Sequence, residues 1–457
     1  MPVKYIDELQ KLPESTLNNP DAMVQNMVGE QSGVRHLFTN DLHLRALRRQ
    51  LTPNINLYIS PILDEISNAA KDVMPQAEDW VEIDIADTIL QINARTTSQV
   101  FVGSSWCRNP AWIKLAVETT LNTFQTVATL RMMPSFLQFL HPVLVWVMPC
   151  TYRLENNYRD ARTLIIPVIE KLREERKNEK SEKGDEAPTL LSWMADYAEN
   201  VKEGEPDNLA KRQIALGIGS THTIKHSMCQ IFYDFCAYSK HMKEIREEIE
   251  EVLIESGKWD RSTLDKLWKL DSFMLESQRM GPPQICTLPL PMSKLLVEQE
   301  LTYSSNHTVT FHHRTRKPVT LSDGTRIPTN TQIGFPAAAA LFDPEIISNP
   351  ETFDPLRYYR SRLDASSGET KSQQFGVPSH THMHFGYGKH SCPGRVFANY
   401  LEKIMVSVLL LKFDFRLVEG KERPKNVTLD EFMFFAPGVN LSCKRRSLKK
   451  GIPDFDA

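Results

Sequence analysis

One cysteine stands in a glycine-punctuated loop near the C-terminal end of the chain. Residues Phe385 to Arg395 read FGYGKHSCPGR, so that Cys392 directly precedes Pro393, which suits the start of a helix. The glycines let the backbone pass close to a flat cofactor, and amides at a helix N-terminus stabilise negative charge on sulfur. These residue types suit a metal-bound thiolate. The alternative is a buried structural cysteine beside a tight turn, which composition alone favours.

The spacing Phe385-x-x-Gly388-x-x-x-Cys392-x-Gly394 resembles the haem-binding loop of the cytochrome P450 monooxygenases. Four fixed residue types within ten positions make this match specific. Three further segments match in the expected order: Glu276-Ser277-Gln278-Arg279, Phe353-Asp354-Pro355-Leu356-Arg357 and Gly219-Ser220-Thr221-His222-Thr223. The segments YIDEL, LTP and TLSDGTRIP are most similar to fungal members, notably the ent-kaurene oxidase-like group.

The resemblance implies a role for each segment. It makes the Cys392 thiolate the axial ligand of the iron in haem b, which favours cleavage of the O–O bond. Glu276 and Arg279 are three positions apart and share one face of a helix. Arg357 is expected to complete a buried ionic cluster with them, although a lone Glu-x-x-Arg is common on any helix.

The Gly219–Thr223 segment is similar to the oxygen-activating stretch of the family. Thr223 is expected to supply a hydroxyl to the proton relay that family members use. The alternative is a core threonine that bonds back to a carbonyl of the previous turn. His222 stands where many relatives have an acid, and it either carries protons or only fills space.

Haem propionates need cationic or hydrogen-bonding partners, and the resemblance suggests three. His390, two positions before the cysteine, is one of them. Arg48, or the adjacent Arg49, is the second, and His313 stands where relatives commonly have an arginine. The rest of the predicted cofactor-binding set comes from the loop itself, namely Phe385, Cys392 and Gly394.

Two other histidine patterns suggest a metal ion. His380, His382 and His384 alternate, which would place three imidazoles on one side of a strand. His222 and His226 are four positions apart on a predicted helix, but no glutamate follows His222 as in a zinc hydrolase. A dedicated non-haem metal site is the less favoured interpretation of both patterns.

Helices must position most of these residues, in a mainly α fold with a small β region. Apolar residues at three- and four-residue spacing predict helices over Ile55–Val73, Asp84–Phe101 and Ala111–Val127. A segment that is apolar on nearly all sides predicts a central buried helix over Leu209–Tyr238. The other expected elements are helices over Met242–Ser256, up to Met280 and from Pro393 to Leu411, strands and turns from Thr308 onward and over Phe413–Val418 and Phe432–Leu441, and an irregular loop over Asn349–Arg362.

Composition limits the class of protein. The 457 residues include 54 Lys+Arg and 57 Asp+Glu, 41% are hydrophobic and 24% are charged. These values exclude a disordered chain, and the net charge of −3 gives no bulk electrostatic reason to bind nucleic acid. Seven scattered cysteines without a Cys-x-x-Cys pair argue against a disulfide framework or a structural zinc site.

An apolar segment, Phe136–Cys150, is interrupted by a histidine and two prolines and is too short to span a membrane. It is either a buried helix pair with a proline-marked turn or an apolar surface that dips into one face of a bilayer. The resemblance implies the cytosolic face of the endoplasmic reticulum membrane. A soluble chain is the alternative, because the N-terminal anchor of the pattern is missing.

Two segments depart from the family pattern. The sequence lacks the anchor and first β elements, so a single P450 domain over residues 1–457 is expected to be N-terminally incomplete. Residues 285–306 have no counterpart in the pattern, and we interpret them as an insertion, either translated intron or a genuine loop.

The resemblance predicts a haem-thiolate monooxygenase that inserts one oxygen atom from O2 into a hydrophobic small molecule. It implies a fungal secondary metabolite such as a terpenoid as substrate, and electrons from NADPH through a cytochrome P450 reductase. The alternative is a truncated, non-catalytic or misfolded product that keeps the motifs. A third hypothesis is a haem enzyme that performs isomerisation or peroxide chemistry without a reductase.

Overall fold

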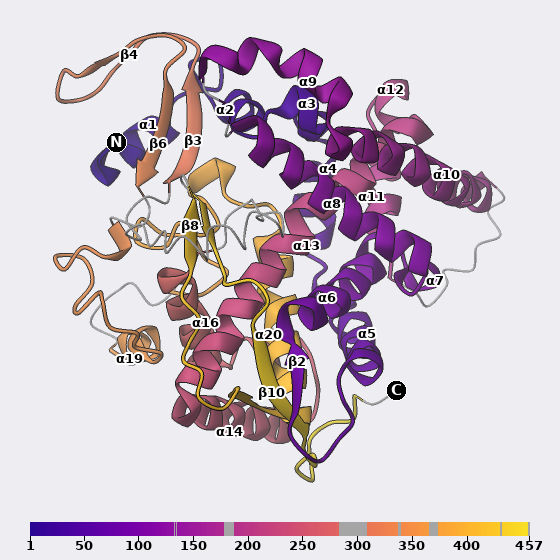
Figure 1. Ribbon diagram of the computed structural model, residues 1–457, viewed down its shortest axis with the longest axis vertical. Coiled ribbons are helices and arrows are strands. Elements are labelled where there is room, and N and C mark those ends of the chain that lie inside the picture. Colours follow the sequence, from indigo (N-terminus) through magenta and orange to yellow (C-terminus); the bar gives the residue numbers. More distant parts are fainter. Residues whose placement is uncertain are drawn as a thin grey trace.

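Helices form most of the chain (Figure 1). The computed structural model describes residues 1–131, 133, 135–177, 187–282, 309–336, 340–364, 373–429 and 432–455. The first half of the chain contains α1 (Ile6–Gln10), α2 (Asn19–Asn26), α3 (Gly29–Ser32), α4 (Leu42–Ala46), α5 (Asn56–Val73), α6 (Ile85–Phe101), α7 (Ser104–Cys107), α8 (Pro110–Arg131), α9 (His141–Val147), α10 (Pro149–Lys177), α11 (Leu190–Asp196) and α12 (Val201–Gly204). The second half contains α13 (Pro206–Ala237), α14 (Ser239–Ser256), α15 (Arg261–Leu264), α16 (Trp268–Met280), α19 (Arg357–Leu363) and α20 (Arg395–Lys412).

The described strands form small antiparallel sheets. One sheet has the order β1 (Leu17–Asn18), β3 (Val309–Thr315), β6 (Gln332–Pro336), and a second has the order β2 (Val81–Asp84), β10 (Asn440–Arg445), β7 (Phe413–Leu417). Two hairpins pair β4 (Val319–Thr320) with β5 (Arg326–Ile327) and β8 (Val427–Leu429) with β9 (Phe432–Phe434). The first sheet lies beside the N-terminus and next to α1 (Figure 1). The mainly α architecture expected from the sequence is therefore confirmed.

Helix α13 runs through the middle of the molecule and packs against α6, α8, α10, α16 and α20 (Figure 1). It begins at Pro206, whose missing N–H is no loss in the first turn of a helix. Helix α6 begins where the Asp84 carboxylate accepts the N–H of Asp87 at 3.0 Å. Most residues of both helices are buried, many of them in one large apolar cluster, so their polar side chains must find partners inside the protein.

Three expectations need comment. The segment expected to be an irregular loop over Asn349–Arg362 contains α19, in which the side chain of Arg362 reaches the buried carboxylate of Asp271 on α16. The expected strand Phe432–Leu441 is two strands, β9 and β10, with a turn at Gly438. The predicted insertion 285–306 lies outside the described residues.

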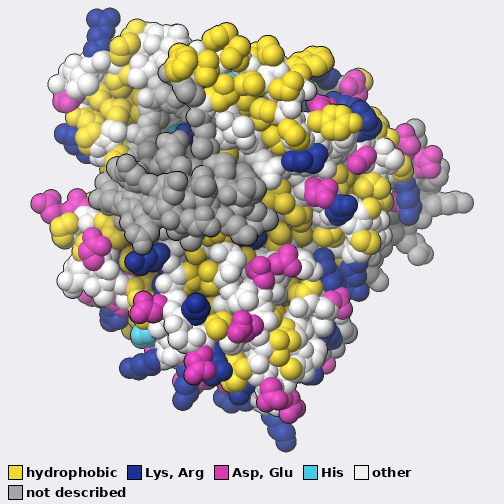
Figure 2. All heavy atoms as spheres, in the orientation of Figure 1, with side chains coloured by type: hydrophobic (Ala, Val, Ile, Leu, Met, Phe, Trp, Pro, Cys, Tyr) yellow, Lys and Arg dark blue, Asp and Glu magenta, His cyan; other side chains and the backbone are white. Residues whose placement is uncertain are grey.

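The Phe136–Cys150 segment is not a buried helix pair. It forms a 3₁₀ turn over Ser135–Leu140 followed by α9, and several of its large apolar side chains are exposed. Figure 2 shows hydrophobic side chains gathered on the surface over α9. Among the described residues, none of the helices is long and apolar enough to cross a membrane.

Candidate functional site

The loop before α20 holds Cys392 through backbone hydrogen bonds. The Cys392 N–H donates to the Phe385 carbonyl at 2.7 Å, and the Ser391 N–H donates to the Gly388 carbonyl at 3.1 Å. Gly388 has a φ of +65°, and a Cβ there would lie 2.1 Å from Oε1 of Gln10. Glycine is therefore favoured at this position, because a side chain would be strained by this φ and the Gln10 amide would have to move aside.

The thiol of Cys392 lies at the N-terminus of α20. It accepts hydrogen bonds from the backbone N–H groups of Gly394 and Arg395, and the cysteine is free and partly exposed. Burial of the sulfur atom raises the pKa of Cys392, while these N–H groups and the charges of Arg395 and Arg48 lower it. The loop thus supplies the donors that a thiolate needs, and a bound cation would favour the deprotonated form.

The three predicted propionate partners meet beside this loop. The Arg48 guanidinium donates to the Lys389 carbonyl at 3.0 Å. The rings of His313, on β3, and His390 lie edge to face with their centroids 5.0 Å apart. His390 Nε2 is buried and has no hydrogen-bond partner within the described part of the chain, and its nearest carboxylate oxygen, on Glu14, is 3.8 Å away. One arginine and two histidines from three distant segments therefore share a region that suits an anionic group.

One side of α13 is more open than the rest of the helix. Gly219 is exposed and Leu216 and Thr223 are half-buried, whereas most of their neighbours are buried. A Cβ at Gly219 would meet no described atom within 4 Å. The Thr223 hydroxyl donates to the Gly219 carbonyl at 2.6 Å, which is the back-bond given above as the alternative to a relay. The hydroxyl is nevertheless on the open side, where it can change partner.

His222 lies on a different side of α13 from Thr223. Its ring is buried with its edge to Phe124 of α8, and neither ring nitrogen has a hydrogen bond to a described residue. Burial lowers the pKa of His222 to about 3, and the charge of Lys225 adds to this effect. The imidazole is therefore neutral near pH 7, and the geometry favours the space-filling interpretation over the proton carrier.

The predicted ionic cluster is formed. Arg279 and Glu276 make two hydrogen bonds of 2.8 Å, and both side chains are fully buried. The Arg357 guanidinium approaches Glu276 Oε2 at 3.4 Å. Arg279 also donates to the carbonyls of Leu341 and Pro350, so the cluster ties α16 to the chain that leads into α19.

The alternating histidines do not line one side of a strand, so the structure does not support the less favoured metal interpretation of this pattern. The segment is a turn with one isolated bridge, and each ring has a different environment. His380 contacts Asp7 at 3.0 Å, His382 stands with its edge on Tyr358, and His384 contacts the Phe375 carbonyl at 3.0 Å. No group of three metal-ligating side chains is found among the residues that the structure describes.

Two buried polar side chains next to α13 are singled out by no motif. Asn93 lies on the buried face of α6, and Glu402 lies on α20 with its carboxylate bonded to the Ser227 hydroxyl of α13. The available signal was weak: a polar residue on an apolar helix face must find a partner, but the sequence does not say which. Ser227 lies on α13, one turn after Thr223, and Glu402 lies on α20, the helix that follows the Cys392 loop. The bond between them therefore joins these two helices.

Glu402 predicts a pH dependence of stability. Burial raises its pKa from 4.5 to about 8, and the bond from Ser227 lowers it only in part. A carboxyl whose pKa is raised by folding stabilises the protein most below its unfolded pKa and loses that contribution as pH rises through the folded pKa. Between pH 5.5 and 8.5, wild type should lose on the order of 3 kcal/mol relative to Glu402→Gln.

Urea denaturation of both proteins at the two pH values measures this difference. Glu251→Gln, at an exposed position of α14, is the matched control and should follow the wild type at both pH values. An equal difference between wild type and Glu402→Gln at pH 5.5 and 8.5 would contradict a protonated buried carboxyl.

Comparisons with known proteins show to which family the chain belongs. A family model described as Cytochrome P450 matches residues 7–311 and 303–442. Cytochrome P450 monooxygenase olcJ of Penicillium canescens is 35% identical over 449 residues, which cover 98% of this chain and 79% of that protein. Cytochrome P450 monooxygenase AN1598 of Emericella nidulans is 34% identical, over 98% of this chain and 78% of that protein. Ent-kaurene oxidase of Fusarium fujikuroi is 31% identical, over 98% of this chain and 79% of that protein. A family whose members bind haem iron through a cysteine thiolate thus matches nearly the whole chain, and the protein belongs to the cytochrome P450 monooxygenases.

Proposed function

We propose that this monooxygenase binds haem through Cys392 and inserts one atom of O2 into a hydrophobic small molecule of fungal secondary metabolism. The observation that supports this most is Cys392, a free and half-buried cysteine whose sulfur atom accepts hydrogen bonds from two N–H groups at the start of α20. Cys107, by contrast, is buried, and its thiol donates to the Ser104 carbonyl at 3.3 Å.

The residues around the loop fit such a cofactor. When bound, haem supplies the oxygen chemistry, and the protein supplies orientation and access. Arg48, His313 and His390 would hold the propionates, since they lie in the same region. Arg48 brings a positive charge, and His390 brings a buried ring nitrogen that has no hydrogen-bond partner among the described residues. Phe385 and Gly394 would complete the loop on the thiolate side, and the Thr223 hydroxyl would hold or pass a proton on the open side of α13.

The names of relatives support a terpenoid substrate. Ent-kaurene oxidases of Fusarium fujikuroi and Gibberella intermedia are each 31% identical to this chain over 98% of its length. We infer that the substrate is a terpenoid and that the electrons come from NADPH through a separate reductase.

Two measurements test this function. The haem-loaded protein, reduced and exposed to carbon monoxide, should show a strongly red-shifted Soret band. With NADPH, a fungal reductase and ¹⁸O₂, it should transfer one labelled atom to at least one member of a panel of terpenoid hydrocarbons that includes ent-kaurene. A red-shifted band without labelled product from any member of the panel would overturn the substrate class but not the cofactor. The absence of the band would favour the non-catalytic alternative, and turnover without NADPH would favour the peroxide or isomerase hypothesis.

We also propose that the surface over α9 contacts a membrane, on the cytosolic face of the endoplasmic reticulum. Phe136, Phe139 and Trp146 are exposed by 73%, 73% and 89%, and they lie on one continuous segment of η4 (Ser135–Leu140) and α9. Large exposed apolar patches mark interaction sites, and aromatic rings suit the headgroup region of a bilayer.

The double variant Phe139→Ser/Trp146→Ser should bind vesicles at least about tenfold more weakly than wild type, because it removes two large apolar side chains from the contact. Flotation with phosphatidylcholine–phosphatidylserine vesicles measures the bound fraction. Val201→Ser is the matched control, since Val201 is 86% exposed but lies on α12, outside the patch. Equal flotation of the double variant and wild type would contradict the proposal.

A further inference from the structure

Asn93 makes an unusual pair of contacts with the Gly219–Thr223 segment. Its side-chain amide, fully buried on α6, donates to the carbonyls of Ser220 at 3.1 Å and Thr221 at 2.9 Å. The Thr97 hydroxyl, one turn later on α6, donates to Asn93 Oδ1 at 3.1 Å and fixes the orientation of the amide. Asn93 therefore hydrogen-bonds to two successive carbonyls of α13 within the segment that carries Thr223.

The part of α13 that Asn93 contacts has a low intrinsic tendency to form a helix. Gly217, Gly219 and Ser220 have low helix propensity, and the hydroxyl of Ser220 bonds back to the Leu216 carbonyl at 3.3 Å. In a regular helix the carbonyls of Ser220 and Thr221 accept from the N–H groups of residues 224 and 225. A carbonyl oxygen can accept two hydrogen bonds, so the Asn93 amide adds a second bond to each of these carbonyls, and α6 thereby helps to hold this turn of α13.

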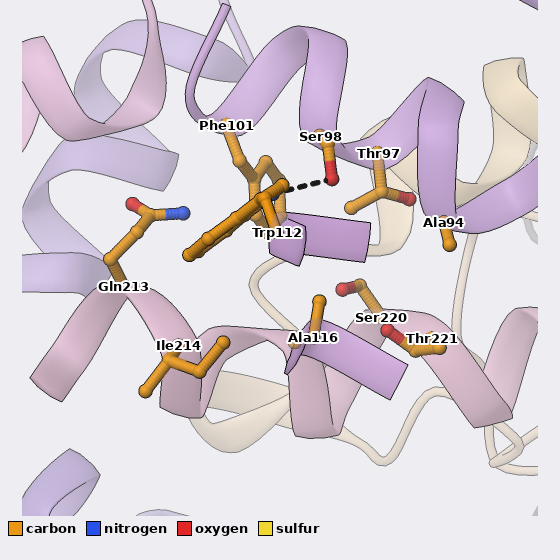
Figure 3. Close-up of a pocket in the computed structure, with 11 residues that line it drawn as sticks. Ala94, Thr97, Ser98, Phe101, Trp112, Ala116, Gln213, Ile214, Ser220 and Thr221 are labelled. Carbon is orange, nitrogen blue, oxygen red and sulfur yellow. Dashed lines mark hydrogen bonds between the residues drawn. The ribbon is translucent and has the colours of Figure 1, made fainter. Parts of the chain in front are cut away.

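Packing alone does not support the segment on the α6 side. A cavity of about 20 Å³ lies between α6, α8 and α13, and Figure 3 shows the Gln213 amide directed toward Trp112 across it. Gly217, Ser220 and Thr221 line this cavity, and neither polar atom of Gln213 has a hydrogen-bond partner within the described residues. The space suffices for one water molecule and leaves room for the segment to shift. The carbonyls of Ser220 and Thr221 therefore depend on Asn93 more than they would in a close-packed interface.

We propose that Asn93, oriented by Thr97, is a positioning residue that holds the Gly219–Thr223 segment in register with the site. It approaches α13 from a side other than the open side that carries Gly219 and Thr223, so it does not contact substrate or cofactor. Its effect reaches the site through the backbone of one helical turn, which places the Thr223 hydroxyl.

Hydrogen exchange of the haem-loaded protein tests directly whether Asn93 holds this segment. In Asn93→Ala, amides in the 219–225 segment should exchange about tenfold faster than in wild type, because two buried hydrogen bonds are lost. Amides in 228–237 of the same helix should not change. Thr97→Val keeps the Asn93 amide but removes its orienting hydroxyl, and it should give a smaller increase confined to the same segment. Thr96→Val is the matched control, since Thr96 is equally buried on α6 but bonds only to its own helix.

The catalytic consequence rests on the proposed function, whereas the exchange result does not. With reductase and NADPH, Asn93→Ala should release several-fold more hydrogen peroxide per NADPH consumed, and Thr96→Val should behave as wild type. If the carbon-monoxide band were absent from wild type, the proposed function would fail. The hydrogen-exchange comparison would still test whether Asn93 holds the Gly219–Thr223 segment. Unchanged exchange in 219–225 in both Asn93→Ala and Thr97→Val, or a uniform increase along all of α13, would overturn the proposal.

Discussion

Replacing Cys392 with alanine should abolish the red-shifted carbon-monoxide band and essentially all turnover of this P450. The sulfur atom is the predicted donor to the iron, and no other described cysteine lies in this loop. The fold should survive, because the side chain is partly exposed and its hydrogen bonds come only from neighbouring backbone N–H groups. Reduced carbon-monoxide difference spectra and far-ultraviolet circular dichroism of the same samples separate loss of ligand from loss of fold.

Two further variants sharpen this result. Cys392→Ser keeps a hydrogen-bond acceptor for the N–H groups of the loop but offers a hard oxygen in place of the soft thiolate, so it should also lack the red-shifted band. Cys107→Ala removes a thiol that is buried in α7 and should keep the band. A red-shifted band that persists in Cys392→Ala would show that another residue binds the iron.

Local patterns predicted the elements that carry the site. The helix expected over Leu209–Tyr238 is α13, Pro206–Ala237, and the helix expected after Pro393 is α20, because an apolar stripe and a proline-marked start are properties of neighbouring residues. The sequence does not predict helix α19, because Pro355 and several arginines are typical of an irregular loop as long as the partners of the arginines are unknown. Those partners, such as Asp271, are nearly a hundred residues away and appear only in the folded chain.

For a similar reason, the sequence predicts some residues of the site and not others. The positions of Arg48, His313 and His390 in the family pattern predict that all three hold the propionates. The structure places the three side chains beside one loop. The environment of His222 was left open, because the sequence does not reveal that its ring meets Phe124 in an apolar region. Asn93 was missed altogether, since its partners are carbonyls more than 120 residues away and backbone atoms leave no sequence signal.

The largest loss of stability is expected from Glu276→Gln. This change removes the negative charge that pairs with Arg279, whose side chain is fully buried, and weakens the contact with Arg357. Removing one partner of a buried ion pair typically costs about 3–5 kcal/mol, because the other charge stays buried without compensation. Urea denaturation followed by circular dichroism measures the change in the free energy of unfolding.

An exposed ion pair provides the matched control. Glu247 lies 3.9 Å from Lys243 on α14, and both side chains are more than half exposed. Glu247→Gln should change the free energy of unfolding by less than about 1 kcal/mol, because solvent screens such a pair. Similar effects of Glu247→Gln and Glu276→Gln would show that burial does not strengthen the cluster.

The double variant Glu276→Leu/Arg279→Leu decides whether Arg279 acts only as the partner of Glu276. Replacing a buried ion pair by apolar side chains is often neutral, so an isolated pair predicts that stability is restored. Here Arg279 also donates to the carbonyls of Leu341, Pro350 and Thr352, at 3.1, 2.7 and 3.2 Å. Leucine cannot satisfy these acceptors, and each buried unsatisfied group costs about 1–3 kcal/mol. The double variant should therefore stay destabilised, and full recovery would mean that these carbonyls find water and that Arg279 does not anchor the chain leading to α19.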